Sequence, residues 1–549
     1  MSSPSHKSKS TSRPNLVHLP AELFAAVASH LPNRDIKNLR LTCKILRERA
    51  SLGLDRVFLS ANSRNLEVFY AIAGHETFRK GIVEIVWDDA RLVYNIERTN
   101  EAIHQLMESP SRERCPSWFS RACKKNIDDL ASRKENDADR PDHVARTQQI
   151  DAQLPLNVSW NYYQQLLRQQ EDVLESGADI DALRHGLDRF SSLRRITITP
   201  AAHGFLFTPL YETPMIRAFP YGFNYPIPRG WPTPDLGEVP YEAPPWDDEA
   251  EKRKWRGFSI VTRELAKQDH HISELILDVN QLNTGLNCHV FDQPCEEYDN
   301  LALLLRRPGF CRIDLALLAD GQEWEDWSSF RSGYLKLALG EARDLQHVSL
   351  RTQVDVNQFY EATLSGTSES TEHFIPLRTI LPIDKWQRLR HFGLSNFLVR
   401  QDDLISLLAA LPASLRFVEL SYLTFLGDGG NYRDLLADMR NTLGWRDRPA
   451  NWRPMVTILV GIQHIVSTRA LCMDSEVNEF LYGDGTNPFG QAGYGPDQPS
   501  YGRGIERDPF EPAHDRPNVD YITLMRMGIV KKDAGLLGEQ ESGTTGGSS

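Results

Sequence analysis

The sequence has no long hydrophobic run and only seven cysteines. Its longest apolar stretches, such as ISLLAALP (405–412) and VTILVGI (456–462), fall short of the roughly 20 residues that span a bilayer. Six of the first twelve residues are serine, and no apolar stretch of the signal-peptide kind occurs there. The cysteines form no Cys-x-x-Cys pair, which argues against a disulfide framework. We therefore expect a reducing location in the cytoplasm, the nucleus or both, and no membrane partner.

Signatures of catalysis are also missing. The chain contains no Gly-x-Ser-x-Gly motif and no Gly-x4-Gly-Lys-Ser/Thr phosphate loop, and HETFR (75–79) has Arg79 where a zinc-protease helix needs its second histidine. The best metal candidates, Cys288, Cys295 and Cys311, are separated by 7 and 16 residues. Structural zinc sites normally have tighter ligand pairs. We predict no enzyme activity, no metal and no cofactor.

The charge is negative overall but uneven. The formal net charge of −12 argues against a nucleic-acid partner, because nucleic-acid binding rests on neutralising phosphates. Residues 34–56 depart from this balance, with seven basic and three acidic side chains. Such a patch suits an acidic protein surface, and a solvated helix face is the equally good alternative.

Residues 19–50, LPAELFAAVASHLPNRDIKNLRLTCKILRERA, predict two short amphipathic helices. Pro20 suits the first turn, and the first helix ends before Pro32. Asn33 is a suitable N-cap for the second helix. In that helix, steps of three and four residues place one apolar stripe at Ile36, Leu39, Cys43, Leu46 and Ala50. So small a hairpin exposes more apolar surface than it can bury, which predicts packing against a further surface.

The residue order of this stretch resembles the F-box motif: Leu19-Pro20, Glu22-Leu23, Val27, Leu31-Pro32, Asp35-Ile36, Leu39-Arg40 and Cys43-Lys44. Leu46 stands where many F-boxes carry tryptophan. The resemblance implies docking on a Skp-family linker protein and, through it, on the cullin of a cullin–RING ubiquitin ligase. It assigns linker binding to Leu19, Pro20, Leu23, Val27, Leu31, Pro32, Ile36, Leu39, Cys43, Lys44 and Leu46. An ordinary hairpin packed on its own chain is the alternative.

A second pattern, apolar-x-x-apolar-x-apolar, occurs after the hairpin. It fits IVEIVW (82–87), LRRITI (193–198), ISELIL (272–277), LQHVSL (345–350), LRHFGL (389–394) and LRFVEL (415–420). The last two apolar positions lie two apart, as on one face of a strand, and predicted helices precede several copies. The pattern resembles the strand of a leucine-rich repeat. We predict an α/β fold in which residues 56–482 form an irregular leucine-rich-repeat-like solenoid; a compact α/β domain is the alternative.

The side chains that alternate with the apolar strand residues are predicted to face away from the core and to be available to a partner. They are Arg195 and Thr197, Glu274 and Ile276, His347 and Ser349, His391 and Gly393, and Phe417 and Glu419. Their charges are mixed, so they indicate neither an acidic nor a basic partner.

Four further segments complete the predicted organisation. Residues 1–14 form a disordered tail before the F-box helices at 15–55, and 100–150 is a charged insertion. Residues 209–245 form a second insertion with ten prolines and seven aromatic residues. Residues 483–549 hold 13 glycines and are predicted to be a low-complexity, disordered tail.

The aromatic residues of the 209–245 insertion have two interpretations. The favoured one is a covering loop whose rings pack onto the array. The other is a substrate-binding role for Phe219, Tyr221, Phe223, Tyr225 and Trp231 as rigid anchors.

The predicted function follows from the F-box resemblance, which together with the chain's length also makes it similar to large fungal F-box proteins. We expect a substrate-recognition adaptor of an SCF-type ubiquitin ligase, with an unknown protein substrate bound by the repeat region. The alternative is a protein-interaction scaffold that does not direct ubiquitination. A hydrolase without recognisable motifs is a more distant third.

Overall fold

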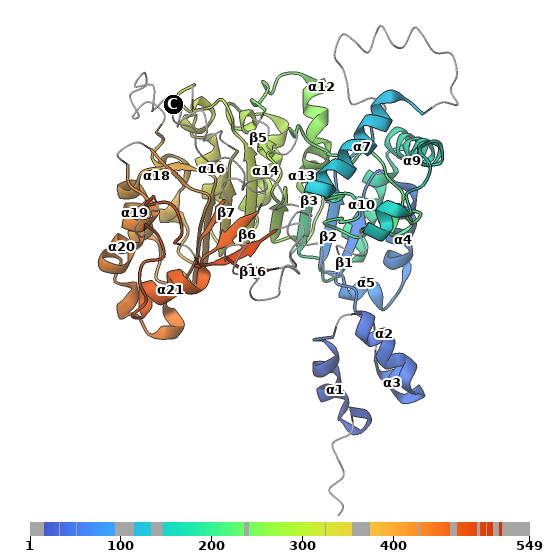
Figure 1. Cartoon of the computed structure of the whole chain (residues 1–549), viewed down its shortest axis with the longest axis horizontal. Coiled ribbons are helices and arrows are strands. Elements are labelled where there is room, and N and C mark those ends of the chain that lie inside the picture. The colour runs from blue at the N-terminus through green and yellow to red at the C-terminus, as the bar shows by residue number, and fades with distance from the viewer. Residues whose placement is uncertain are drawn as a thin grey trace, which may run out of the picture.

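The computed structural model describes residues 16–31, 33–50, 52–93, 115–132, 147–234, 241–323, 325–353, 374–426, 429–461, 469–490, 495–500, 502–508 and 515–518. The chain is an α/β protein with one large, mainly parallel sheet (Figure 1). Among its described helices, none combines the length and apolarity that crossing a bilayer requires.

The large sheet contains ten strands, nine of which follow one another in chain order. These nine are β1 (Arg56–Leu59), β2 (Glu84–Asp88), β3 (Arg195–Thr199), β4 (Glu274–Leu277), β6 (Arg312–Leu318), β7 (His347–Arg351), β8 (His391–Ser395), β10 (Phe417–Ser421) and β12 (Met455–Thr457). Every neighbouring pair is parallel. The short β5 (Leu286–Asn287) pairs with the end of β6. All six predicted segments are therefore strands of one parallel sheet in the predicted order.

Two further strands carry the same apolar pattern but were not recognised in the sequence. Leu54, Val57 and Leu59 lead into and form β1, and Phe310 stands three residues before Ile313 of β6. The last strand, β12, has Arg453 at the leading position and lacks the pattern. When β1 and β6 are counted as copies of the six-residue pattern, fewer long stretches of sequence separate one copy from the next.

Alternation along the strands separates the two faces of the sheet. In β7, Val348 and Leu350 are buried, whereas His347, Ser349 and Arg351 between them are partly exposed. The apolar positions of the other strands join the same continuous core. Because successive side chains of a strand point to opposite faces, the polar positions share one face, which we name the open face.

Helices cover the apolar face in a row that follows the chain (Figure 1). Neighbours in this row are α4 (Ser63–Gly74), α10 (Ala178–Arg189), α13 (Arg256–Lys267), α14 (Glu296–Arg306), α16 (Tyr334–Glu341), α18 (Leu377–Ile380), α19 (Gln401–Ala410), α20 (Tyr432–Thr442) and α21 (Asp474–Tyr482). Short helices α5 (Phe78–Gly81), α11 (Pro214–Arg217), α12 (Glu249–Lys252) and α15 (Ser328–Arg331) lie in the connections. Alternation of strands and helices is the predicted pattern.

Local sequence explains where the helices start and stop. The Asn62 side chain accepts hydrogen bonds from the first backbone amides of α4 and caps it. The 21-residue helix α9 (Leu156–Ser176) ends at Gly177, whose φ of 67° is a left-handed conformation that favours glycine. The chain then turns directly into α10.

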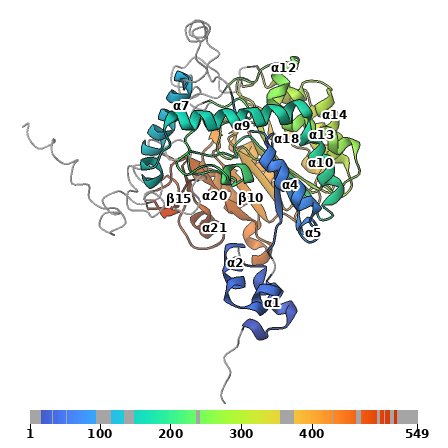
Figure 2. The ribbon, with the colours of Figure 1, turned by 90° about the vertical axis from the view of Figure 1, so that its right-hand side faces the viewer.

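The first insertion contains one described helix, α7 (Ser117–Ser132), which packs against α9. Phe119 and Cys123 of α7 are buried with Trp160 and Tyr163 of α9 in a second core. Figure 2 shows α9 running along the upper edge of the molecule beside α7. Residues 94–114 and 133–146 of this region lie outside the described part of the chain.

Part of the predicted disordered tail is folded. β15 (Ile505–Arg507) pairs with β14 (Ala470–Cys472), which pairs with β13 (Leu459–Gly461), and β16 (Arg516–Pro517) completes this antiparallel sheet. A separate pair of short strands, β9 (Leu398–Val399) and β11 (Thr424–Phe425), is parallel. Phe489 is buried and stacks on Tyr432 of α20. The prediction of a wholly disordered 483–549 segment was wrong because this aromatic ring and a strand edge anchor it.

Candidate docking surface

The N-terminal helices form a small module with its own core. It comprises α1 (Ala21–Ala28), α2 (Asn33–Thr42) and α3 (Lys44–Arg49), and it projects from the α/β body in both views (Figures 1 and 2). Phe24, Ile36, Leu46 and Ala50 are buried together in a cluster separate from the main core. The core of the module is therefore formed by its own helices and does not include residues of the sheet.

A single arginine fastens the segment before α1 to α3. The Arg49 guanidinium donates to the carbonyl oxygens of Val17 and Leu19, at 2.8 and 2.6 Å, and lies 4.9 Å from the centroid of the Phe24 ring. Asn33 joins the module to the chain before β1, because its side chain exchanges two hydrogen bonds with the backbone of Gly53. These contacts fix the ends of the module.

Four large apolar side chains of the module face solvent. Leu23 is 56% exposed, Val27 45%, Leu41 84% and Ile45 50%. An isolated exposed apolar residue is common, whereas four within 23 residues of a small folded unit are unusual. We name these four residues the apolar face.

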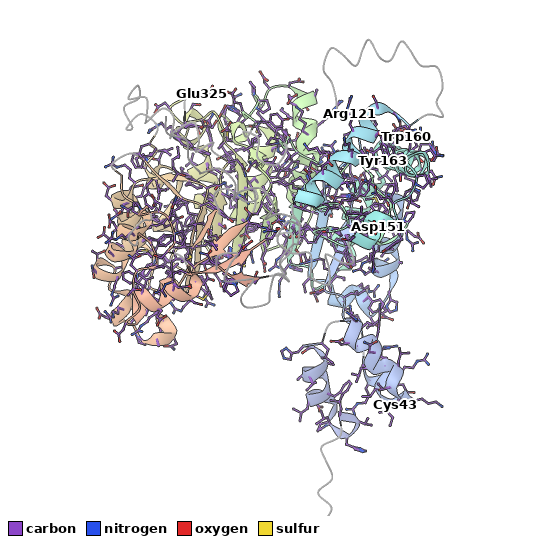
Figure 3. All side chains as sticks on the ribbon, viewed as in Figure 1. Cys43, Arg121, Asp151, Trp160, Tyr163 and Glu325 are labelled. Carbon is purple, nitrogen blue, oxygen red and sulfur yellow. The ribbon has the colours of Figure 1, made fainter. Side chains whose placement is uncertain are left out.

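The predicted linker-binding residues divide into core and surface. Ile36 and Leu46 are buried, and Leu19, Leu31 and Leu39 are partly buried against the module core. Pro20, Leu23, Val27, Cys43 and Lys44 are exposed, and Figure 3 shows Cys43 on the module, away from the sheet. Pro32 lies outside the described residues.

The predicted stripe is confirmed for Ile36, Leu39, Leu46 and Ala50, which belong to the module core, and wrong for Cys43, which is exposed. The prediction of one unbroken helix was wrong, because Cys43 has extended φ and ψ of −160° and 164°, so α2 ends at Thr42 and α3 begins at Lys44. Leu41 and Ile45 do not lie on the stripe and are exposed, and the sequence analysis did not name them as surface residues.

The open face of the sheet carries a row of charged and aromatic side chains in register. At one level across the strands it runs Arg56, Glu84, Arg195, Glu274, Arg312, His347, His391, Phe417 and Met455. The predicted outward positions lie on this face.

Opposite charges pair along the first half of this row. Arg56 Nε lies 2.7 Å from Glu84 Oε2, and Arg195 lies 2.5 Å from Glu274 Oε2. Arg312 reaches Asp314 of its own strand at 2.5 Å. The charged half of the row is thus largely compensated within the sheet.

Imidazole stacking links the charged half to the aromatic half. His347 Nε2 lies 3.0 Å from Asp314 Oδ1, and the His347 and His391 rings stack with centroids 3.8 Å apart. Burial lowers the pKa of His391 to about 4, so this ring is neutral near pH 7. Phe417 and Met455, which continue the row, are exposed.

A cavity of about 370 Å³ opens on this face between β1 and β7. Its lining includes Arg351 at the end of β7, and Asp278 and Asn280 from the loop after β4. Tyr211, also in the lining, donates to Asp278 Oδ2 at 2.6 Å. Sequence analysis did not single out Arg351 or Asn280, since neither lies within the repeated six-residue pattern.

The aromatic residues of the Pro-rich insertion serve mainly as packing. Phe223, Tyr225 and Trp231 are buried, and Phe219 is partly buried against the core that contains α7 and α9. This packing fits the covering interpretation, and a substrate-anchoring role for these rings stays a prediction. Phe219, Tyr221, Phe223 and Tyr225 line a hollow of about 350 Å³, and among them Tyr221 is 59% exposed.

The insertion is locked to the body through the buried side chains of Asp89 and His203. Trp231 Nε1 donates to Asp89 Oδ2 at 2.9 Å, and the Gly257 amide donates to the same carboxylate. His203 Nδ1 lies 2.8 Å from Tyr225 Oη, and its Nε2 lies 4.0 Å from Asp88 Oδ2. Burial lowers the pKa of His203 to about 3 and raises that of Asp88 to about 8, so both groups are neutral near pH 7.

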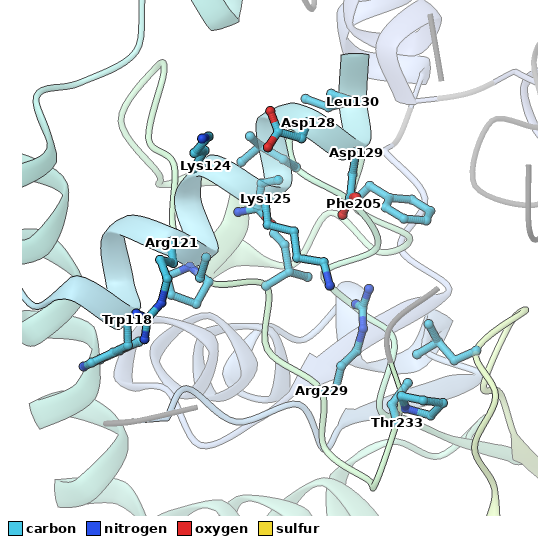
Figure 4. Close-up of a pocket in the computed structure, with 17 residues that line it drawn as sticks. Trp118, Arg121, Lys124, Lys125, Asp128, Asp129, Leu130, Phe205, Arg229 and Thr233 are labelled. Atoms are coloured by element: carbon cyan, nitrogen blue, oxygen red, sulfur yellow. The ribbon is translucent and has the colours of Figure 1, made fainter. Parts of the chain in front are cut away.

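A larger hollow of about 600 Å³ lies between α7 and the 205–234 loops (Figure 4). Figure 4 shows Lys125 of α7 and Arg229 extending toward each other, with Asp129 nearby. Arg121 also lines it, and each of these four charged residues already has a partner within the chain.

The cysteines considered as metal ligands are separate free thiols in the structure. Cys288 is buried in the main core, and burial raises its pKa. Within the described ranges, no group of three or more His, Cys, Asp or Glu side chains is arranged to hold a metal ion.

No protein-family model matches the chain, and no curated protein matches it significantly.

Proposed function

We propose that this protein is a substrate-recognition adaptor of an SCF-type ubiquitin ligase. The module α1–α3 docks on a Skp-family linker protein, which connects it to a cullin, and the α/β body presents a protein substrate. The adaptor makes and breaks no bond itself. It accelerates ubiquitin transfer by holding the substrate near the catalytic partners, since proximity replaces a bimolecular encounter. Such an adaptor acts in the cytoplasm, the nucleus or both.

The observation that carries this proposal is the apolar face on a module with an independent core. Phe24, Ile36 and Leu46 hold the helices together, so Leu23 and Val27 are left free for a partner. Lys37, Lys44 and Arg47 on α2 and α3 of the same module are also exposed, and their positive charge suits an acidic linker. The F-box-like residue order in the same helices supports a Skp-family protein as that partner.

The body is proposed to be a leucine-rich-repeat-like solenoid. Nine parallel strands in chain order and a row of neighbouring helices support this interpretation. The pattern shared by β1 and β6 with the six recognised segments also supports it. A solenoid offers an extended strand face suited to protein partners.

Affinity purification of the full-length protein from cells tests the adaptor function. We expect the linker and the cullin to co-purify, and substrates to accumulate when the gene is deleted. Recovery of the linker without cullin would favour the scaffold alternative. Recovery of neither would reject the F-box assignment.

A further inference from the structure

Arg351 is a buried cation that interacts electrostatically with Asp278 and Glu419 but forms no ion pair with either in the described structure. It ends β7 on the open face, where its guanidinium donates to the backbone oxygen of Asn280 and to Gln281 Oε1. Among the described residues no carboxylate forms an ion pair with it, and its Nε has no hydrogen-bond acceptor. Burial lowers the pKa of Arg351 because the charged form is poorly solvated. A bound anion would relieve this cost.

A second donor without an acceptor lies beside it. Asn280 Nδ2 is buried and has no partner in the described structure, and the residue sits at a φ of 51° after β4. Arg351 and Asn280 line the same cavity of about 370 Å³. Buried donors are nearly always satisfied, so two unsatisfied donors at one cavity point to an acceptor that binds there.

The other charges of the lining leave room for an anion. The lining contains four arginines and three carboxylates, and Glu274, just outside the lining, pairs with Arg195. Each carboxylate already has a donor within the fold: Glu84 has Arg56 and Thr197, Asp314 has Arg312 and His347, and Asp278 has Tyr211. Of the four lining arginines, Arg351 is the one without a carboxylate at ion-pair distance, although Asp278 and Glu419 act on its charge from farther away.

We propose that this cavity, the Arg351 pocket, binds an acidic group, a carboxylate or a phosphate, carried by an extended segment of a protein partner. A protein segment fits better than a free anion because the cavity opens on a sheet face whose row continues to exposed Phe417 and Met455. In register, Arg351 of β7 faces Ser395 of β8, which faces Ser421 of β10, and Phe417 lies four residues before Ser421. Two strand spacings and four residues along the strand give a diagonal of roughly 16 Å between Arg351 and Phe417, the length of about five extended residues. The segment therefore carries an apolar residue about five positions from its acidic group. As a statement about the ligase substrate, this inference rests on the proposed function.

Degenerate peptide pools test the pocket directly. Each pool has a central Glu, phosphoserine, Gln or Lys, with leucine five positions to either side, and binding to the full-length protein is measured by fluorescence polarisation. We expect the Glu or phosphoserine pool to bind about 10- to 100-fold more tightly than the Gln pool, as one charge-assisted hydrogen-bonding site provides. Preference for Glu identifies a carboxylate ligand, and preference for phosphoserine alone identifies a phosphate.

Variants then assign the preference to Arg351. Arg351→Met should abolish it, Arg351→Lys should retain part of it, and the exposed control Arg388→Met should leave it intact. If the Met variant does not fold, the comparison of acidic and Gln pools on the wild-type protein still decides. Equal binding of the Gln pool, or full preference in a folded Arg351→Met protein, overturns the proposal. Linker binding measured on the same proteins separates the two proposals, because an acidic preference without linker binding refutes only the adaptor function.

Discussion

Replacing Leu23 and Val27 with alanine tests the apolar face most directly. Fully burying such a side chain contributes about 1.5–3 kcal/mol. Since Leu23 is 56% and Val27 45% exposed, a linker that covers both gains roughly half of this from each side chain, or about 1.5–3 kcal/mol together. We therefore expect Leu23→Ala/Val27→Ala to weaken linker binding by about 10- to 150-fold.

Isothermal titration calorimetry with a purified Skp-family linker measures the effect. The double variant should keep the thermal unfolding midpoint of the wild type, because substitutions at exposed positions change stability by only about 0.5 kcal/mol. Leu337→Ala is the matched control, since Leu337 is exposed on α16 of the body. An unchanged Kd for the double variant, or an equal loss in the Leu337 control, would refute the assignment of the linker to this face.

Three further predictions concern the module core and the buried polar groups. Phe24→Ala should unfold the module and abolish linker binding while the body keeps its unfolding midpoint, because Phe24 belongs to a separate core; limited proteolysis shows which part is cut. Trp231→Phe removes one donor from buried Asp89 and should lower the free energy of unfolding by about 1–3 kcal/mol in urea denaturation; no change would contradict the locking role. Asp88 stays protonated in the folded protein up to about pH 8 but ionises near pH 3.8 when unfolded, so its contribution to stability falls as the pH rises through that window. Asp88→Asn should therefore become more stable relative to wild type between pH 5 and pH 7.5, and a constant difference would contradict the raised pKa.

The strands were predictable because each needs only local information. In LRHFGL the apolar residues two apart, Phe392 and Leu394, must share one face, and that face must be buried. The helix at 401–410 was predictable for the same reason, since its buried leucines recur at helical spacing. Strand β12 was missed because Arg453 stands where the pattern has its first apolar residue, three positions before Val456.

The sequence by itself determined the alternation of strands and helices, the independent N-terminal module and the residues available for its core. Only the tertiary structure decided which members of the predicted stripe are buried, because the helix breaks at Cys43 and leaves its side chain exposed. Burial of the loop rings depends on contacts with α7 and α9, which come from distant parts of the chain. The Arg351 pocket likewise unites residues from six strands and their loops. The periodicity of a sequence shows which face of a helix or strand is apolar. It does not show which side chains meet across 70 or more residues, as Arg351 and Gln281 do, because packing of the whole chain sets those contacts.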